Sequence, residues 1–248
     1  MIAPGIDIGS RYIKSALVAD GRLVSFDRME TGCDPLAGCR LILGEVKADR
    51  VMATGYGRHL LEVHGDIPAV TEIKAFARGA RHFFPASRTV IDIGGQDTKV
   101  IALSAQGRVI KFEMNDRCAA GTGKFLEVMA RSLGYDLEAF GALPDEEGEG
   151  ITISSMCTVF AESEVVSLIA RGAGRSKIAA AIHRAVAARV AGMVKRIPAE
   201  EEIVFAGGCA RGSLLRSMLE RSLGKRLLVP KFPEITGALG AALCAGGD

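Results

Sequence analysis

Two short segments of the chain place a carboxylate beside glycines in a pattern suited to phosphate binding. One segment reads Asp-Ile-Gly-Ser at 7–10, and the other reads Asp-Ile-Gly-Gly-Gln-Asp at 92–97. A carboxylate at a strand end can hold a hydrated Mg²⁺, and glycine has no Cβ, so backbone N–H groups can approach phosphate oxygens. Two such loops facing each other would grip a nucleoside triphosphate, and Lys14 would add a positive charge to the first loop.

The two segments belong to an internal duplication. Residues 5–26 and 90–112 both contain an apolar run, the Asp-Ile-Gly sequence, a lysine, a second apolar run, a turn and a third β-rich run. The two aspartates align, and Lys14 aligns with Lys99. Each copy predicts a β-hairpin followed by a third strand. The duplication therefore predicts two similar subdomains that face each other across a cleft.

A third glycine-rich segment, Ala-Gly-Gly-Cys-Ala at 206–210, follows an apolar strand pattern and precedes a helical one. Its paired glycines, Gly207 and Gly208, would allow the close approach of an adenosine. Other nucleotide-binding motifs do not fit this sequence. Gly123-Lys124 is followed by Phe125, which breaks the Walker A pattern, and the Rossmann GxGxxG sequence is absent.

Two of the six cysteines have unusual surroundings. Cys118 and Cys157 are 39 residues apart, and each precedes a helical pattern. Each thiol is expected near a helix N-terminus, where the helix dipole favours the thiolate that ligates metal. Two thiolates do not complete a 4Fe-4S cluster, which takes four, but a two-fold homodimer would supply them. A four-cysteine zinc site has the same ligand count, and two free packing cysteines are the simplest alternative.

The remaining cysteines and the histidines give weaker signals. Cys33, Cys39, Cys209 and Cys244 are expected to serve packing. The histidines show no ligand spacing among themselves and are expected at the surface: His59, His64, His82 and His183.

The patterns between these motifs predict an α/β protein. The main helices are expected at 71–82, 123–133, 158–171, 176–197, 211–223 and over the small residues that close the chain, with late strands at 203–208 and 226–230. In the longest helix, six apolar residues recur at three- and four-residue steps and predict a buried stripe: Ile178, Ile182, Val186, Val190, Met193 and Ile197.

The composition supports a globular core and argues against two classes of partner. Of 248 residues, 48% are hydrophobic, and 31 basic against 29 acidic residues leave a net charge of +2. The sequence has no basic stripe for nucleic acid, no 18-residue uncharged apolar stretch for a membrane, and no signal-peptide pattern at its N-terminus. We therefore expect a cytoplasmic protein with no nucleic-acid partner and no membrane partner.

The residues around these motifs resemble one protein family. NDRCAAGTGKF and SSMCTVFAESEV surround the two cysteines, and TGYGR at 54–58, DIGGQD at 92–97 and TGALGAAL at 236–243 accompany them. Together they closely resemble the activators of 2-hydroxyacyl-CoA dehydratases and the ATPase subunits of ATP-dependent benzoyl-CoA reductases. These proteins belong to the actin and sugar-kinase superfamily, and the resemblance runs nearly from end to end.

This resemblance implies an actin-like ATPase fold, in which two ribonuclease-H-like subdomains close over Mg-ATP. The subdomains are expected at 1–85 and 86–248, and the second would carry both cluster cysteines. A final helix near 236–246 would pack back toward the first subdomain.

The resemblance also implies a set of nucleotide-binding residues. Asp7 and Asp92 would hold the hydration shell of Mg²⁺, and Gln96 or Asp97 would orient the hydrolytic water. Arg11 stands where the family usually has threonine, and Glu234 stands where an amide is expected near the adenosine. The full set is Asp7, Gly9, Ser10, Arg11, Tyr12, Ile13, Lys14, Asp92, Gly94, Gly95, Gln96, Gly207, Gly208 and Glu234.

The implied activity is that of an ATP-driven electron donor. One 4Fe-4S cluster, shared by a homodimer through Cys118 and Cys157, would pass an electron at low potential to a partner iron–sulfur dehydratase or reductase. Ferredoxin or flavodoxin would reload the cluster. A benzoyl-CoA-type or double-cubane-cluster reductase is an alternative partner. The sequence also allows a small-molecule kinase of the same fold, an iron–sulfur sensor or a zinc-stabilised dimer.

Overall fold

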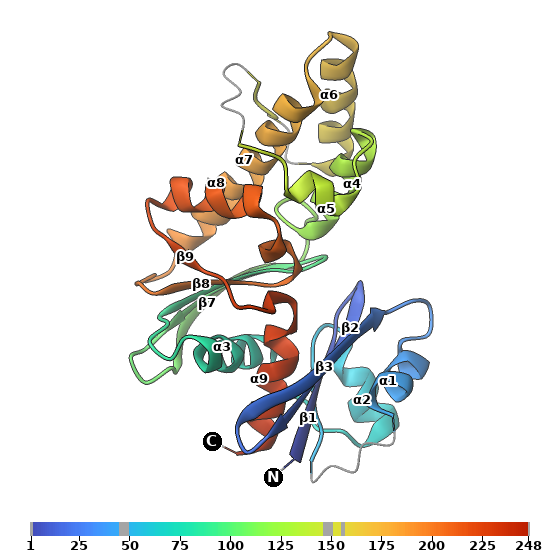
Figure 1. Cartoon of the computed structure of the whole chain (residues 1–248), viewed down its shortest axis with the longest axis vertical. Helices are drawn as coiled ribbons and strands as arrows, with labels where there is room; N and C mark the ends of the chain where they lie inside the picture. Colours follow the sequence, from blue (N-terminus) through green and yellow to red (C-terminus); the bar gives the residue numbers. More distant parts are fainter. Residues whose placement is uncertain (1, 45–49, 146–150, 155–156, 248) are drawn as a thin grey trace.

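The computed structural model describes residues 2–44, 50–145, 151–154 and 157–247, which contain two β-sheets with helices packed around and between them (Figure 1). The first sheet has the strand order β3-β2-β1-β4, and the second has the order β7-β6-β5-β8-β9. The strands are β1 (Ile2–Ile8), β2 (Tyr12–Ala19), β3 (Arg22–Glu30), β4 (Met52–Thr54), β5 (Thr89–Ile93), β6 (Thr98–Leu103), β7 (Val109–Asn115), β8 (Ile203–Ala206) and β9 (Leu227–Leu228).

The helices connect and cover these strands. They are α1 (Pro35–Leu43), α2 (Arg58–Gly65), α3 (Glu72–Phe83), α4 (Gly123–Ser132), α5 (Leu137–Gly141), α6 (Thr158–Ala170), α7 (Arg175–Val194), α8 (Ser213–Leu223) and α9 (Thr236–Ala245), with 3-10 turns η1 (Gly208–Arg211) and η2 (Pro233–Ile235). None of the helices in the described part of the chain is long and apolar enough to cross a membrane.

The predicted duplication is confirmed by the topology of the two sheets. β1, β2 and β3 form an antiparallel meander, β5, β6 and β7 form a second one, and each sheet adds a parallel strand beside its first strand. In the turn between β2 and β3, Asp20 and Gly21 both have positive φ angles, 48° and 75°, which suit a two-residue turn. The strand register pairs Asp7 with Lys14 and Asp92 with Lys99.

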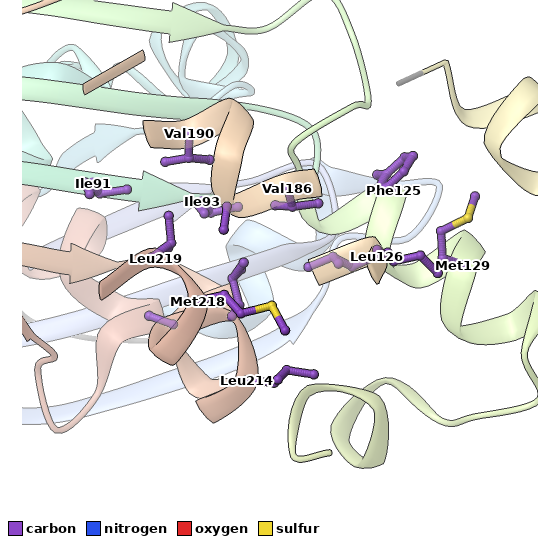
Figure 2. Packing of buried hydrophobic residues seen from close by; sticks show 14 of the residues in the cluster. Ile91, Ile93, Phe125, Leu126, Met129, Val186, Val190, Leu214, Met218 and Leu219 are labelled. Atoms are coloured by element: carbon purple, nitrogen blue, oxygen red, sulfur yellow. The ribbon is translucent and has the colours of Figure 1, made fainter. Parts of the chain in front are cut away.

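The main core lies between the second sheet and the helices α4, α7 and α8. Figure 2 shows Ile91 and Ile93 of β5 close to Val186 and Val190 of α7, with the apolar side chains of α4 and α8 beside them. All six residues of the predicted stripe are buried, which confirms that prediction. Because this apolar core holds β5 in place, the second phosphate loop, which follows β5 directly, begins from a well-packed strand.

Helices α3 and α9 lie side by side between the two sheets (Figure 1). Phe76 and Ala80 of α3 pack against the second sheet, whereas Leu239 and Ala242 of α9 pack against the first. The helices approach so closely that a Cβ on Gly240 would lie 1.7 Å from the Ala75 carbonyl oxygen. The predicted boundary between subdomains 1–85 and 86–248 stays a prediction. Helix α3 precedes this boundary in sequence, but it packs against the second sheet.

Candidate functional site

A cleft with a volume of about 1060 Å³ lies between the two sheets. Its walls come from both copies of the duplication, from α3, and from the helices α4, α5, α7 and α8. Most of the residues that the sequence nominated for nucleotide binding line this cleft, namely Asp7, Ser10, Arg11, Tyr12, Lys14, Asp92, Gly94, Gly95, Gln96, Gly207, Gly208 and Glu234.

Two of the nominated residues, Gly9 and Ile13, do not line the cleft. The Ile13 side chain is fully buried in the core beneath the first sheet, so it cannot touch a nucleotide there. The Gly9 N–H donates to the Tyr12 carbonyl 3.1 Å away, and the Gly94 N–H donates to the Asp97 carbonyl at 2.9 Å. These two amides are therefore used inside their own loops, which leaves other loop amides to meet a phosphate.

The two aspartates occupy equivalent positions at the ends of β1 and β5. Lys14 Nζ lies 2.9 Å from Asp7 Oδ2, and Lys99 Nζ lies 3.3 Å from Asp92 Oδ2. Each carboxylate is also buried, so it is held at the cleft floor by a lysine from the neighbouring strand. Burial of a carboxylate beside a cation limits its movement and fixes the direction in which its second oxygen points.

A glycine with positive φ closes over each of these carboxylates. Gly55 follows β4 with φ of +95°, and a Cβ there would lie 2.5 Å from Asp7 Oδ1. Gly207 follows β8 with φ of +84°, and a Cβ there would lie 2.3 Å from Asp92 Oδ1. The duplication thus includes the fourth strand of each unit, which sequence reasoning did not align. The signal available was a glycine directly after each short apolar strand.

The Asp92 carboxylate has an unsatisfied oxygen. Among the residues that the structure describes, Asp92 Oδ1 is buried and has no hydrogen-bond partner. Burial raises the pKa of Asp92 to about 7, and the nearby carboxylates of Asp97 and Glu72 add to this while Lys99 opposes it. A buried acceptor of this kind fits a cation or a water held by a cation. The donor set at the cleft floor therefore fits a hydrated Mg²⁺.

Lys99 is the centre of a buried charge cluster that sequence reasoning missed. The side chain is 1% exposed, and its Nζ lies 2.7 Å from Glu72, 2.6 Å from Asp97 and 3.3 Å from Asp92. Burial alone would lower the pKa of Lys99, but the three carboxylates outweigh burial and raise it. Glu72 comes from the first turn of α3, where no motif marks it. The alignment of Lys99 with Lys14 in the duplication was the one sequence feature that could have indicated a place for Lys99 beside an aspartate.

Arg11 extends from the first loop to the opposite wall of the cleft. Its Nη1 lies 2.5 Å from Glu127 Oε1 on α4, and Lys124 lies 3.5 Å from the other oxygen of that carboxylate. Burial alone would raise the pKa of Glu127, but the hydrogen bond and charge of Arg11 outweigh burial and hold this pKa below its ordinary value.

The two phosphate loops also come close to each other. A Cβ on Gly95 would lie 3.1 Å from Ser10 Oγ, so a side chain at this position would crowd the first loop. The first amides of α4 bind the second loop directly, since Gly123 N–H donates to Gly94 O at 2.9 Å and Lys124 N–H donates to Gly95 O at 2.7 Å. The second loop and the start of α4 are therefore joined by direct backbone hydrogen bonds.

The part of the cleft where the sequence predicts the adenosine contains Gly207, Gly208 and Glu234. Glu234 is buried, and its Oε1 accepts from Arg211 Nη1 at 2.8 Å. Cys209 also lines this end, and burial raises the pKa of its thiol to about 12, which keeps it neutral. The guanidinium of Arg211 therefore offsets the acidic group that stands where an amide is expected.

His183 is buried, so the prediction that all four histidines lie at the surface is wrong. The side chain is 1% exposed on α7 and forms part of the cleft wall. Its ring centroid lies 4.5 Å from that of Phe140 on α5. His183 lies beside the apolar stripe on the helix surface, so the buried part of α7 is wider than the stripe alone.

The two nominated cluster cysteines are both exposed. Cys157 is the N-cap residue of α6, as expected. Cys118 lies five residues before α4, whose N-cap is Thr122, so its segment leads into the helix without capping it. Between Cys118 and the helix, Gly121 has a positive φ of 83°. Within the described ranges of one chain, no group of three or more histidine, cysteine and acidic side chains is arranged to hold a metal.

Comparison with known proteins gives consistent matches over almost the whole chain. The family model described as the BadF/BadG/BcrA/BcrD ATPase family matches residues 5–245. The chain is 39% identical to the 2-hydroxyisocaproyl-CoA dehydratase activator of Clostridioides difficile, over 99% of this chain and 95% of that protein. It is 40% identical to the (R)-2-hydroxyglutaryl-CoA dehydratase activating ATPase of Acidaminococcus fermentans, over 97% and 95%. It is also 33% identical to a benzoyl-CoA reductase subunit of Thauera aromatica, over 79% and 70%.

Solved structures agree with these matches. The Clostridium difficile activator with bound ADPNP superposes with a TM-score of 0.89 at 39% identity, covering 99% of this chain and 94% of that one. Component A of the Acidaminococcus fermentans dehydratase gives a TM-score of 0.92 at 38% identity, covering 99% and 97%. A ROK family glucokinase from Streptomyces griseus, covered fully, gives 0.64 at 16% identity, which shows a shared fold alone.

Proposed function

The chain belongs to the BadF/BadG/BcrA/BcrD ATPase family, and we propose that it is a reductive activator coupling ATP hydrolysis to electron transfer toward a partner iron–sulfur dehydratase. The observation that carries this proposal is the 39% identity with a dehydratase activator across 99% of the chain. The match to a benzoyl-CoA reductase component favours a reductase as the second candidate partner. A small-molecule kinase is less well supported, because the glucokinase shares the fold alone.

Nucleotide binding in the cleft is supported by its paired loops. Asp7 and Asp92 would hold the hydration shell of Mg²⁺, as the unpartnered Oδ1 of Asp92 suggests. Ser10 and Gly95 lie where amides of both loops would meet the phosphates, and Gly207 and Gly208 would border the adenosine. Gln96 lines the cleft and is our candidate for orienting the hydrolytic water, because Asp97 is held by Lys99.

The exposed cysteines support a site shared between two copies of the chain. When bound, a 4Fe-4S cluster supplies an electron at low potential, and it requires four ligands. Cys118 and Cys157 from each of two copies would provide them. Beside Cys157, α6 exposes Val159 and Phe160 at 68% and 67%, and an exposed apolar surface of this kind favours an interface. Ferredoxin or flavodoxin would be the electron donor.

The contacts of α4 provide a route by which the nucleotide would affect the cysteines. The N-terminus of α4 is hydrogen-bonded to the second phosphate loop, and the segment carrying Cys118 leads directly into this helix. At its other end, Ser132 donates to Glu162 Oε1 of α6 at 3.0 Å, and Cys157 caps α6. Movement of the loop on nucleotide binding would therefore reach both cysteines.

The test is anaerobic purification followed by iron and zinc analysis and an ATPase assay. We expect about four irons for each pair of chains, and steady ATP hydrolysis without any phosphate acceptor. Cys118→Ser and Cys157→Ser should each lose the iron, whereas the matched exposed control Cys33→Ser should keep it. A zinc-containing protein, or iron loss in the Cys33 variant, would refute the assignment.

A further inference from the structure

The wall of the cleft contains a buried imidazole that the proposed reaction does not use. His183 lies on α7 and contacts the Phe140 ring at a centroid distance of 4.5 Å. Leu126 and Leu215, which are also buried, line the same cleft from α4 and α8. Apolar side chains together with a small number of polar groups are the usual lining of a pocket for a flat organic ring.

The contacts around His183 place it near the end of the cleft assigned to the adenosine. Phe140 is followed by Gly141, where a Cβ would lie 3.2 Å from the Cα of Gly212. Gly212 precedes α8 and directly follows the turn that begins at the glycine pair. His183 is therefore linked through two short contacts to the loop of Gly207 and Gly208, and it lies on a different element from the two aspartates assigned to Mg²⁺.

The hydrogen bonding of His183 fixes which ring nitrogen carries the proton. Nδ1 lies 2.9 Å from the Ala179 carbonyl oxygen, and a carbonyl can only accept, so Nδ1 is the protonated nitrogen. Burial lowers the pKa of His183 to about 4, which keeps the ring neutral near pH 7. Nε2 therefore holds a lone pair and acts as a hydrogen-bond acceptor. In the described part of the chain, no hydrogen bond to Nε2 is found.

We propose that His183 selects adenine, with Nε2 accepting a hydrogen bond from the exocyclic 6-amino group of the base. This inference rests on the proposed nucleotide-binding function and adds to it the residue that reads the base. Hypoxanthine and guanine carry a carbonyl oxygen at the same position, so two acceptors would face each other and both would lose a partner. Leaving buried polar groups unpaired is the strongest means that a binding site has to reject a close analogue.

The test compares the dissociation constants of ADP and IDP by calorimetry, because the two nucleotides differ at this position of the base. The wild-type protein should bind ADP about 10- to 100-fold more tightly than IDP. His183→Leu should weaken ADP binding and bring the ratio of the two constants close to one. His183→Gln should instead tighten IDP binding relative to His183→Leu, because its amide can rotate to donate to the carbonyl oxygen.

A matched control separates this reading role from a general effect on packing. Ile182→Val alters the neighbouring buried position of α7, which does not line the cleft, and should leave the ratio unchanged. If His183→Leu does not fold, the IDP affinity of His183→Gln relative to wild type decides. An unchanged ratio in folded His183 variants, or equal binding of ADP and IDP by the wild type, would overturn this inference alone. Absence of any ADP binding by the wild type would overturn the proposed function as well.

Discussion

The guanidinium of Arg11 and the carboxylate of Glu127 meet across the nucleotide cleft at 2.5 Å. Arg11 belongs to the loop between β1 and β2, and Glu127 belongs to α4, so the pair joins the two walls of the cleft. The same helix begins with amides bonded to the second phosphate loop. The nucleotide phosphates and Glu127 would therefore compete for one cation.

We predict that Glu127→Gln tightens Mg-ATP binding by up to about fivefold, because the substitution frees Arg11 for the phosphates. This magnitude corresponds to the small energy of a partly exposed ion pair. Calorimetry with a non-hydrolysable analogue measures the change. Glu113→Gln, which breaks a pair with Arg196 outside the cleft, is the control and should have no effect. Weaker binding in Glu127→Gln would show that the pair supports the site rather than competing for it.

Asp7→Asn and Asp92→Asn should each nearly abolish ATP hydrolysis, because each removes a charge that holds the hydration shell of Mg²⁺. Iron content should stay unchanged in both variants, since the cysteines lie on other segments. Phosphate release and iron analysis on the same preparations check both parts. Turnover at the wild-type rate in either variant would remove that aspartate from the metal site.

The burial of Asp92 predicts a specific pH dependence of stability in metal-free, nucleotide-free protein. Its folded pKa is about 7, above an unfolded value of about 4, so the folded state binds this proton more tightly. The resulting stabilisation is present at low pH and is lost as the pH rises from about 4 to about 7. Asp92→Asn should therefore raise the melting temperature at about pH 8 and have a much smaller effect at about pH 4.

Thermal unfolding of both proteins in the presence of a chelator checks this prediction. Asp27→Asn, at an exposed position of β3, is the control and should change little at either pH. A melting temperature that falls at high pH in Asp92→Asn would show that the carboxylate charge is compensated better than its burial indicates.

The packing of α9 against α3 gives a prediction for stability. Gly240→Ala would place a methyl group 1.7 Å from the Ala75 carbonyl oxygen, so the helices must separate. We expect the free energy of unfolding to fall by about 1–3 kcal/mol or more, as in other overpacked cores. Gly192→Ala is the matched control, because a Cβ there meets nothing within 4 Å and the residue lies inside α7. Urea denaturation should show that variant to be equal to wild type or slightly more stable.

The fold could be predicted because both copies of the duplication carry the same sequence motif at the same place in their strands. Each Asp-Ile-Gly sequence ends an apolar strand, and a lysine seven residues later occupies the paired position on the next strand. The family and its actin-like ATPase fold, expected from the sequence, are confirmed by relatives and solved structures. The short helices α1, α2 and α5 were not predicted, because their few turns give no clear periodicity.

The parts of the site that were missed depend on contacts between distant segments. Glu72 reaches Lys99 only because α3 packs against the second sheet, and nothing in the local sequence signals this. His183 was placed at the surface because it falls outside the apolar stripe of α7. Small residues such as Ala179 and Ala180 let neighbouring elements cover the surface of α7 beside the stripe as well. The spacing of large apolar residues detects the centre of a buried face, but not how far that face extends over small and polar residues.

The central claim is that nucleotide binding in the cleft controls the redox behaviour of a cluster held by Cys118 and Cys157. The most direct measurement is the midpoint potential of the anaerobic protein, titrated with and without a non-hydrolysable ATP analogue. If the analogue binds the two redox states differently, the potential must shift, and about 59 mV corresponds to a tenfold difference in affinity. We predict a more negative midpoint with the analogue, together with faster chelation of the cluster iron. Identical midpoints and identical chelation rates in the two titrations would contradict the proposed coupling.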